Sequence, residues 1–181
     1  MNSNHSVLSL GKAYPRLFVI ALLLFLAWAS TNAQRVVLQM NNDWAFHRGD
    51  VADGAAPTLD DSHWTAATVP HIMQLEKKHC GGNIIYDGIG WYRRYFKLPQ
   101  SYRHKRVAVA FEGVMKNCTV YLNGHLVGTH HGGYMGFTID LTPHLRWDGQ
   151  NVLALRVESA DAPLTPPGKP QGNMDFYYYS G

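Results

Sequence analysis

The sequence predicts an all-β fold of the jelly-roll or galactose-binding-like β-sandwich type, and three observations support that prediction. Short segments rich in β-branched and aromatic residues recur from Trp44 onward, with turn residues about every 8 to 15 positions. No segment beyond residue 33 carries a long helical period. The dipeptide Asn123-Gly124, between two alternating stretches, is the strongest short signal for a β-hairpin.

Two aromatic and β-branched stretches form the first half of the predicted sandwich. The stretch 91–98, WYRRYFKL, alternates in part and stops at Pro99. The stretch 106–114, RVAVAFEGV, is a β-branched run that is broken at Gly113. Each is therefore expected to form a strand. The large rings of Trp44, Trp64 and Trp91 are expected to pack in the core rather than to serve as sugar platforms.

In the second half of the predicted sandwich, the alternation of apolar and polar residues predicts which side chains lie on each face of a strand. Residues 118–122 are expected to place Cys118, Val120 and Leu122 on one face of a strand and the two residues between them on the other. The stretch 151–159, NVLALRVES, alternates again after the turn WDGQ. The segment 132–134 is expected to leave a hairpin rather than to bind a ligand.

The first 33 residues have the order of a signal peptide. Lys12 and Arg16 precede an apolar run over 17–28, which is followed by the small and polar stretch ASTNAQ. We expect cleavage after Ala33 and an exported domain over 34–181, periplasmic or extracellular. The apolar run of about a dozen residues is short of the roughly 20 that a spanning helix needs. An uncleaved anchor is the alternative, and no membrane association is expected after cleavage.

The charge of the chain argues against nucleic acid as a partner. The chain has 16 Lys and Arg against 13 Asp and Glu. Removal of residues 1–33 takes away Lys12 and Arg16 and leaves 14 basic against 13 acidic residues. Phosphate binding needs a concentrated basic face, and a nearly neutral domain does not provide one.

The sequence carries no motif for a cofactor, a metal or a nucleophile. It has no phosphate-binding loop, no G-x-G-x-x-G after a strand and no G-x-S-x-G turn. No Cys or His pair has zinc-ligand spacing. Cys80 and Cys118 could form a disulfide in an exported chain, and their spacing leaves the free and bonded states open. We therefore assign no cofactor, no metal ligand and no catalytic residue.

Five segments, in order, resemble the N-terminal sugar-binding domain of glycoside hydrolase family 2, the family of β-galactosidases, β-glucuronidases and β-mannosidases. They are WAFHRGD, LDDSHWTAATVPH, GIGWYRRYFKLP, FEGVMKNCTVYLNGHLVGTHHGGYMGFTIDLTPHL and GQNVLALRV. The resemblance covers nearly all of the chain from Trp44 to Gly181. It implies a jelly roll, in agreement with the strand pattern.

The resemblance also implies that the chain ends within a longer architecture. In the family, a segment like NMDFYYYSG continues into another strand, an immunoglobulin-like domain and a TIM barrel that carries both catalytic glutamates. We therefore expect the domain 34–181 to lack its last strand and to depend on a missing C-terminal barrel of the same polypeptide. Glu76, Glu112 and Glu158 are expected to be surface charges, and the 181 residues alone are expected to be inactive.

Four substrate-binding residues are implied by the resemblance. In the family's β-galactosidases the acid in the last segment, here Asp175, helps to hold the sugar. Its carboxylate can accept hydrogen bonds from two sugar hydroxyls, and the rings of Phe176 and Tyr177 can cover the apolar face of a pyranose. Asn83, in the loop before the strand at Trp91, is the fourth candidate. The alternative is that Asp175 caps a turn and the tyrosines fill an interdomain core.

The implied function is that of the N-terminal portion of an exported family 2 glycoside hydrolase. It would act on a β-glycoside or oligosaccharide, with terminal β-galactosides first, by a retaining mechanism. The alternative is a free-standing carbohydrate-binding module without hydrolase activity. The aromatic ending DFYYYSG favours the hydrolase, because a self-sufficient module normally ends in polar residues.

Overall fold

The computed structural model describes residues 35–73 and 88–159. The chain divides into two compact units, Met1–Gln39 and Met40–Gly181. In the first unit, the described residues 35–39 form neither helix nor strand. All the described regular structure belongs to the second unit, which is all-β as predicted, apart from two short 3-10 helices.

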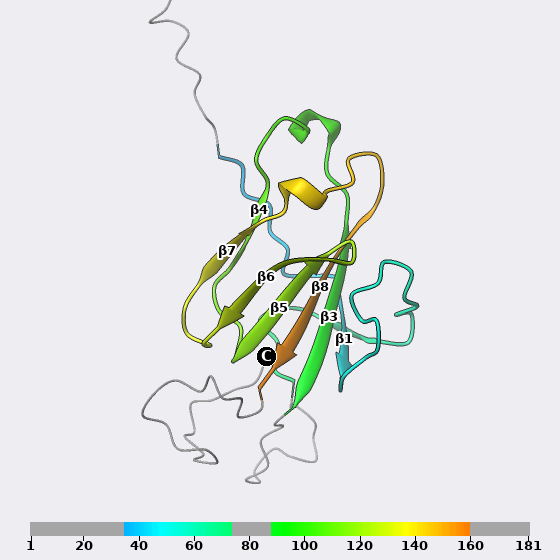
Figure 1. Ribbon diagram of the computed structural model, residues 1–181, viewed down its shortest axis with the longest axis vertical. Helices are drawn as coiled ribbons and strands as arrows, with labels where there is room; N and C mark the ends of the chain where they lie inside the picture. Colours follow the sequence, from blue (N-terminus) through cyan, green and yellow to red (C-terminus); the bar gives the residue numbers. More distant parts are fainter. Residues whose placement is uncertain (1–34, 74–87, 160–181) are drawn as a thin grey trace, which may run out of the picture. The chain divides into compact units, whose positions relative to one another are not determined.

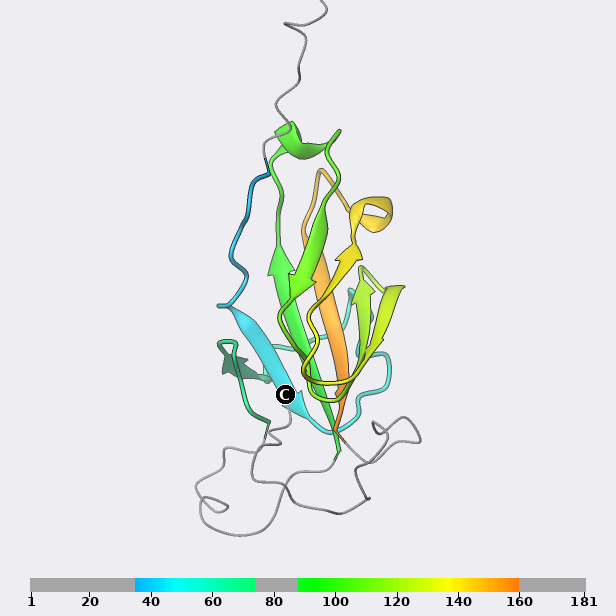
Figure 2. The same cartoon turned by 90° about the vertical axis from the view of Figure 1, so that its left-hand side faces the viewer.

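The second unit is a sandwich of two antiparallel sheets (Figures 1 and 2). The larger sheet has the order β2-β1-β3-β8-β5-β6, and β4 pairs with β7 in the smaller one. The strands of the larger sheet are β1 (Trp44–Arg48), β2 (Thr65–Ala67), β3 (Ile89–Phe96), β5 (Asn117–Leu122), β6 (His125–His131) and β8 (Asn151–Glu158). The remaining elements are β4 (Ala108–Phe111), β7 (Phe137–Asp140) and the helices η1 (Gln100–Tyr102) and η2 (Thr142–His144).

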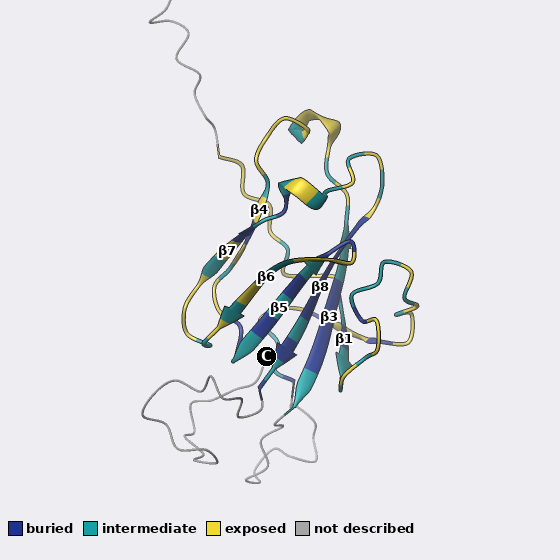
Figure 3. Cartoon of the chain, in the orientation of Figure 1, coloured by how far each residue is buried: buried dark blue, intermediate teal, exposed yellow. Residues whose placement is uncertain are grey.

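The main core lies between the two sheets. The predicted alternation of β5 is confirmed, because Cys118, Val120 and Leu122 are all buried. They pack in one cluster with alternate residues of β8 and with side chains of the smaller sheet, namely Leu153, Leu155, Val157, Val109 and Ile139. Buried residues follow the central strands of the larger sheet in Figure 3, whereas the edge strand β6 is more exposed. The buried residues of β5 and the alternate residues of β8 in this cluster therefore point toward the smaller sheet.

The predicted hairpin between β5 and β6 is confirmed. Asn123 and Gly124 have φ angles of 53° and 86°, as a two-residue turn with both central residues in the left-handed region requires. The buried amide of Asn123 donates to the side-chain oxygen of Asn151 at 2.9 Å and to the carbonyl of His144 at 2.8 Å. The hairpin tip is therefore bonded to the start of β8 and to η2.

A second apolar cluster covers the other face of the larger sheet. It is built on Trp64, Trp91 and Ala154, and its partly buried members include residues of the loop 49–64. Trp44, Trp64 and Trp91 are only 5%, 9% and 4% exposed, which confirms that these indoles pack in the protein interior. The Trp91 indole N–H donates to Asp50 at 2.9 Å. A hydrogen bond from Arg156 lowers the pKa of the Asp50 carboxyl to about 2.

The Arg93 side chain is fully buried beneath this loop. Its Nε donates to Asp61 Oδ2 at 2.7 Å, its Nη1 to the Gly54 carbonyl at 2.6 Å and its Nη2 to the Tyr95 hydroxyl at 3.1 Å. The Tyr95 hydroxyl in turn donates to Asp61 at 3.0 Å. The buried charge is thus paired and hydrogen-bonded, which burial of a charge requires. The Asp-Asp-Ser-x-Trp segment therefore carries the counter-ion of β3.

Replacement of Asp61 by Ala should strongly destabilise the chain. The substitution leaves the Arg93 guanidinium buried without its counter-ion, and loss of one partner of such a pair costs about 3–5 kcal/mol. Urea denaturation of the 181-residue chain would measure the change. Arg106→Ala is the control, because Arg106 also pairs with an aspartate but its side chain is 78% exposed, so little change is expected. Equal effects of the two substitutions would contradict the assignment.

Candidate functional site

The four predicted substrate-binding residues lie outside the described residues. Asn83 belongs to the segment 74–87, and Asp175, Phe176 and Tyr177 belong to the segment 160–181. The structure instead describes the positions at which these segments join the sheet. Met73 precedes the first segment, Gly88 follows it, and Ser159 precedes the second.

Gly88 and Ser159 are hydrogen-bonded to each other. The Ser159 amide donates to the Gly88 carbonyl at 2.9 Å. The Ser159 hydroxyl accepts from the Gly88 amide at 3.1 Å and donates to the Gly88 carbonyl at 3.1 Å. The next residues, Ile89 and Glu158, are paired in the sheet. The chain therefore enters β3 and leaves β8 at the same end of the larger sheet (Figure 1).

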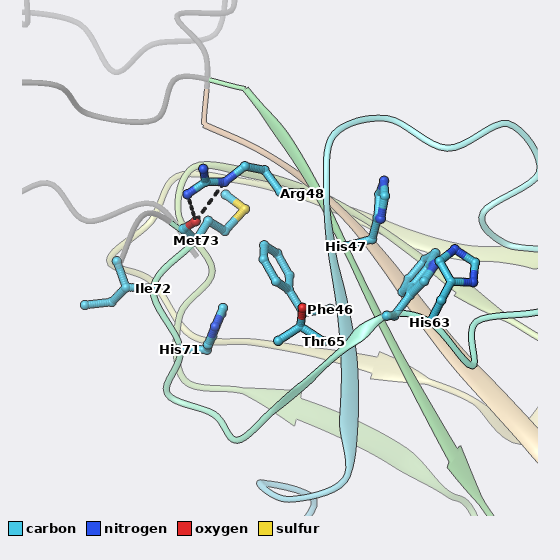
Figure 4. Close-up of a pocket in the computed structure, with 9 residues that line it drawn as sticks. Phe46, His47, Arg48, His63, Thr65, His71, Ile72 and Met73 are labelled. Carbon is cyan, nitrogen blue, oxygen red and sulfur yellow. Dashed lines mark hydrogen bonds between the residues drawn. The ribbon is translucent and has the colours of Figure 1, made fainter. Parts of the chain in front are cut away.

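The chain before the segment 74–87 is held at Met73. The Arg48 guanidinium donates to the Met73 carbonyl through Nε at 3.2 Å and through Nη2 at 2.7 Å (Figure 4). The Met73 side chain is 2% exposed, and its sulfur occupies the space that a Cβ on Gly90 would need. Glycine at position 90 therefore lets Met73 lie against β3.

A hollow of about 240 Å³ lies beside these contacts, where the pairing of β1 with β2 ends. Phe46 and His71 project into it, whereas Ile72 points away (Figure 4). The Phe46 ring lies 4.7 Å from the His71 ring and 4.8 Å from the Tyr92 ring between centroids. The lining residues are Phe46, His47, Arg48, His63, Trp64, Thr65, His71, Ile72 and Met73. None of these nine is acidic, so the set holds no carboxylate for acid or base catalysis.

Burial sets the protonation of the polar pair behind this hollow. His71 Nδ1 and the Tyr92 hydroxyl are hydrogen-bonded at 2.9 Å. Burial lowers the pKa of His71 and raises the pKa of Tyr92. The imidazole is therefore neutral and the phenol protonated at neutral pH, and the pair stabilises the hollow without a charge.

The described residues contain no assembled catalytic group. Glu158 pairs with Arg156 at 3.1 Å, as a surface charge would, and Glu112 is exposed beyond the end of β4. Cys118 is free and buried, and burial raises the pKa of its thiol to about 12, so it is a poor nucleophile. Glu76 and Cys80 lie outside the described residues.

The described ranges contain neither a cluster of metal-ligand residues nor a helix that could span a membrane. Within 35–73 and 88–159, no three His, Cys, Asp or Glu residues gather as metal ligands would. No helix in those ranges is long and apolar enough to cross a membrane.

The sequence did not single out the residues that hold the two segments. Ser159 is the last residue of the alternating stretch 151–159, and Arg48 lies within the segment WAFHRGD. Their partners are a backbone carbonyl and a glycine amide, which leave no side-chain signal. Only the register of β3 with β8 shows that the strand ends meet.

Comparison with known proteins identifies a family. The model of the sugar-binding domain of glycosyl hydrolases family 2 matches residues 82–181. A beta-galactosidase of Bacteroides ovatus is 38% identical over 130 residues, which are 68% of this chain and 15% of that protein. A beta-glucuronidase of Formosa agariphila is 30% identical over 71% of this chain and 14% of that protein. The chain therefore spans about one seventh of the length of these two relatives.

Solved structures agree with the sequence comparisons. A Bacteroides uniformis beta-glucuronidase superposes with a TM-score of 0.73 at 33% identity. The match covers 82% of this chain and 17% of that one. This chain therefore shares the β-sandwich fold with a solved family member, in addition to the sequence similarity.

His71→Gln should weaken the dependence of stability on pH below neutrality. The folded-state pKa of His71 is lowered from 6.5 by burial, so the unfolded chain binds the proton more readily. Stability is then lost as the pH falls through about 6.5 toward the folded-state pKa. Gln does not titrate and can retain a bond to Tyr92. Urea midpoints measured between about pH 7.5 and pH 5 should fall less in the variant, and parallel curves would contradict this.

Proposed function

The chain belongs to glycosyl hydrolase family 2, and from that premise we propose that it is the N-terminal sugar-binding part of an exported hydrolase of terminal β-galactosides. Its relatives include β-galactosidases and β-glucuronidases. In this proposal the chain shapes the sugar subsite, and the bond-breaking carboxylates come from a barrel in the same polypeptide.

One observation of the structure carries the proposal. Gly88 and Ser159 are bonded to each other at one end of the larger sheet. The segment that contains Asn83 ends at Gly88, and the segment that contains Asp175 starts after Ser159. Two segments that join a rigid sheet at one point can contribute to one subsite, and binding loops on a fixed scaffold are a common arrangement.

Within the proposed subsite, each candidate has a distinct role. The Asp175 carboxylate accepts hydrogen bonds from adjacent sugar hydroxyls, and Asn83 contributes a donor and an acceptor. Phe176 and Tyr177 cover the apolar face of the ring. The contribution of this chain to the rate is then positioning of the sugar.

The proposed reaction is retaining hydrolysis. One barrel carboxylate attacks the anomeric carbon, and the leaving oxygen takes a proton from the other. Water then releases the sugar from the covalent intermediate with the acid acting as base. Carboxyl groups about 5 Å apart are needed for this outcome.

A free-standing carbohydrate-binding module is the second candidate. A jelly roll can bind sugars without hydrolysis, and the described residues of this chain hold no assembled catalytic group. The two candidates differ in one measurement, because only the first gives turnover of a β-glycoside by the complete polypeptide.

The proposed export can be tested by identifying the first residue of the mature protein. We expect the secreted protein to begin at Gln34, because Lys12, Arg16, the apolar run and the small residues have signal-peptide order. Mass spectrometry of the amino-terminal peptide from the native host would check this. A peptide that retains residues 1–33 would favour the uncleaved anchor.

Asp175→Ala in the complete polypeptide should raise KM for a nitrophenyl β-galactoside about tenfold, which corresponds to about 1.4 kcal/mol of binding. The loss follows from the removal of charge-assisted bonds to the sugar. Initial rates on β-galactoside and β-glucuronide would also rank the two substrates. Asp148→Ala is the control, since Asp148 is an exposed acid in the turn before β8.

The outcomes separate the alternatives. Unchanged KM and kcat in the Asp175 variant would support the turn-capping role instead. Sugar binding without turnover by the complete wild-type polypeptide would support the binding module. Hydrolysis of glucuronide in preference to galactoside would overturn the galactoside assignment but leave the hydrolase.

A further inference from the structure

We propose that the end of the sandwich that contains η1 and η2 is a docking surface for an acidic polysaccharide, which it recognises through the carboxylates of the sugar units. We call this surface the basic end and define it by four exposed cations, Lys97, Arg103, Lys105 and Arg146. All four lie within the described part of the chain. The inference rests on the proposed function and names the class of polymer that would carry the hydrolysed glycoside.

The charged residues of the described chain are unevenly distributed. The segments 97–106 and 140–150, which contain η1 and η2, hold five basic residues and two acidic ones. The rest of the described ranges 35–73 and 88–159 holds six basic and seven acidic residues. The nearly neutral balance of the chain therefore conceals one positive end. A surface with an excess of one sign attracts a polymer of the opposite sign.

Contacts between the two segments hold these cations at one end of the molecule. The Gln100 side chain donates to the Trp147 carbonyl. Arg106 pairs with Asp140 at 2.8 Å. The two short helices lie at the same end of the sandwich in Figure 1, and exposed residues gather around η1 in Figure 3. Cations that are distant in the sequence therefore share one exposed surface.

Three of the four cations have no carboxylate partner. Among the described residues, no ion pair involves the side chain of Lys97, Arg103 or Arg146. Lys105 lies over the uncharged Tyr102 ring, 5.3 Å from its centroid. Elsewhere in the second unit, the arginines that donate to a carbonyl or a carboxylate of the protein are Arg48, Arg93, Arg94 and Arg156. The positive charge that the protein leaves without a counter-ion is thus concentrated at the basic end.

The chemistry of the basic end suits a polymer of carboxylated sugars better than a single small anion. An exposed ion pair is weak and is screened by salt, so one carboxylate would be held loosely. A chain of uronate units presents a carboxylate on each sugar and can contact several cations at once, and linked contacts strengthen one another. The half-buried Trp147 indole belongs to the same end and offers an apolar surface to the face of a pyranose.

Nucleic acid and anionic lipid are the other polyanions that a basic surface could bind. The proposed function favours the polysaccharide over both of them. An exported polypeptide that positions a sugar for hydrolysis would meet a carboxylated glycan as its own substrate. The binding test therefore includes all three polyanions.

The experiment measures binding of the complete polypeptide to immobilised polygalacturonate by surface plasmon resonance. Arg103→Gln combined with Arg146→Gln should raise Kd about tenfold, because two exposed ion pairs are lost. Binding by the wild-type protein should weaken strongly between about 20 mM and about 200 mM salt. The kcat and KM for a nitrophenyl β-galactoside should be unchanged in the variant, because that small substrate carries no charge.

Two matched variants separate the charge of the basic end from other effects. Arg103→Lys combined with Arg146→Lys keeps both charges and should leave Kd within about twofold of the wild-type value. Thr129→Glu combined with Met135→Glu makes the same change in net charge at exposed positions on β6 and in the loop after it. This variant should also change Kd less than about twofold, because both positions are remote from η1 and η2 (Figure 1). Neutral dextran should not bind.

The inference and the proposed function fail in different ways. If the polypeptide hydrolyses the galactoside but the Gln variant binds polygalacturonate as the wild type does, the inference is wrong and the proposed function stands. An equal loss of binding in the Glu variant, or equal binding of dextran, would also overturn the inference. Equal or tighter binding of duplex DNA or of phosphatidylglycerol vesicles would overturn the assignment to a polysaccharide. If the Gln variant alone loses binding but the wild type hydrolyses no β-glycoside, the proposed function is wrong and the basic end remains a binding surface.

Discussion

The buried Arg93 guanidinium is the constraint on which the larger sheet depends. A charge removed from water must be matched by a counter-ion and by acceptors for its remaining protons. Asp61, Gly54 and Tyr95 meet that need, and two of them come from the loop 49–64. The loop is therefore fixed in place by electrostatics, and the indoles of Trp64 and Trp91 are covered as a result.

The same strand extends this restraint to the end of the larger sheet at which β3 begins and β8 ends. Successive side chains of a strand point to opposite faces, so Arg93 and Trp91 face the loop while Tyr92 faces the main core. Gly90, one residue further toward the start of β3, lies against Met73. Because β3 is held on both faces, Gly88 can serve as a fixed point for the chain that precedes it and for Ser159.

The sequence predicted those features that depend on local pattern. Alternation over residues 118–122 and the Asn123-Gly124 pair predicted a strand and a hairpin, and both are confirmed. The burial of Arg93 could not be predicted, because the adjacent Arg93 and Arg94 point to opposite faces of the strand and only the distant Asp61 supplies the counter-ion that makes burial of Arg93 possible. Ser159 was missed for a related reason, since its partner is a backbone group 71 residues away. The roles of Asn83 and Asp175 stay predictions.

The backbone is held at both ends of the sandwich, but different side chains hold it at each end. At the hairpin end, the side chains of Asn123 and Asn151 bond to each other and to the backbone of Val152 and Arg146, so several amides share the restraint and the end is closed. At the other end, a bidentate arginine holds Met73 and one hydroxyl holds Gly88. These groups anchor the backbone at Met73 and Gly88. In the proposed function this end of the rigid sheet supports the sugar subsite, because positioning depends on the support and recognition on the side chains that it carries.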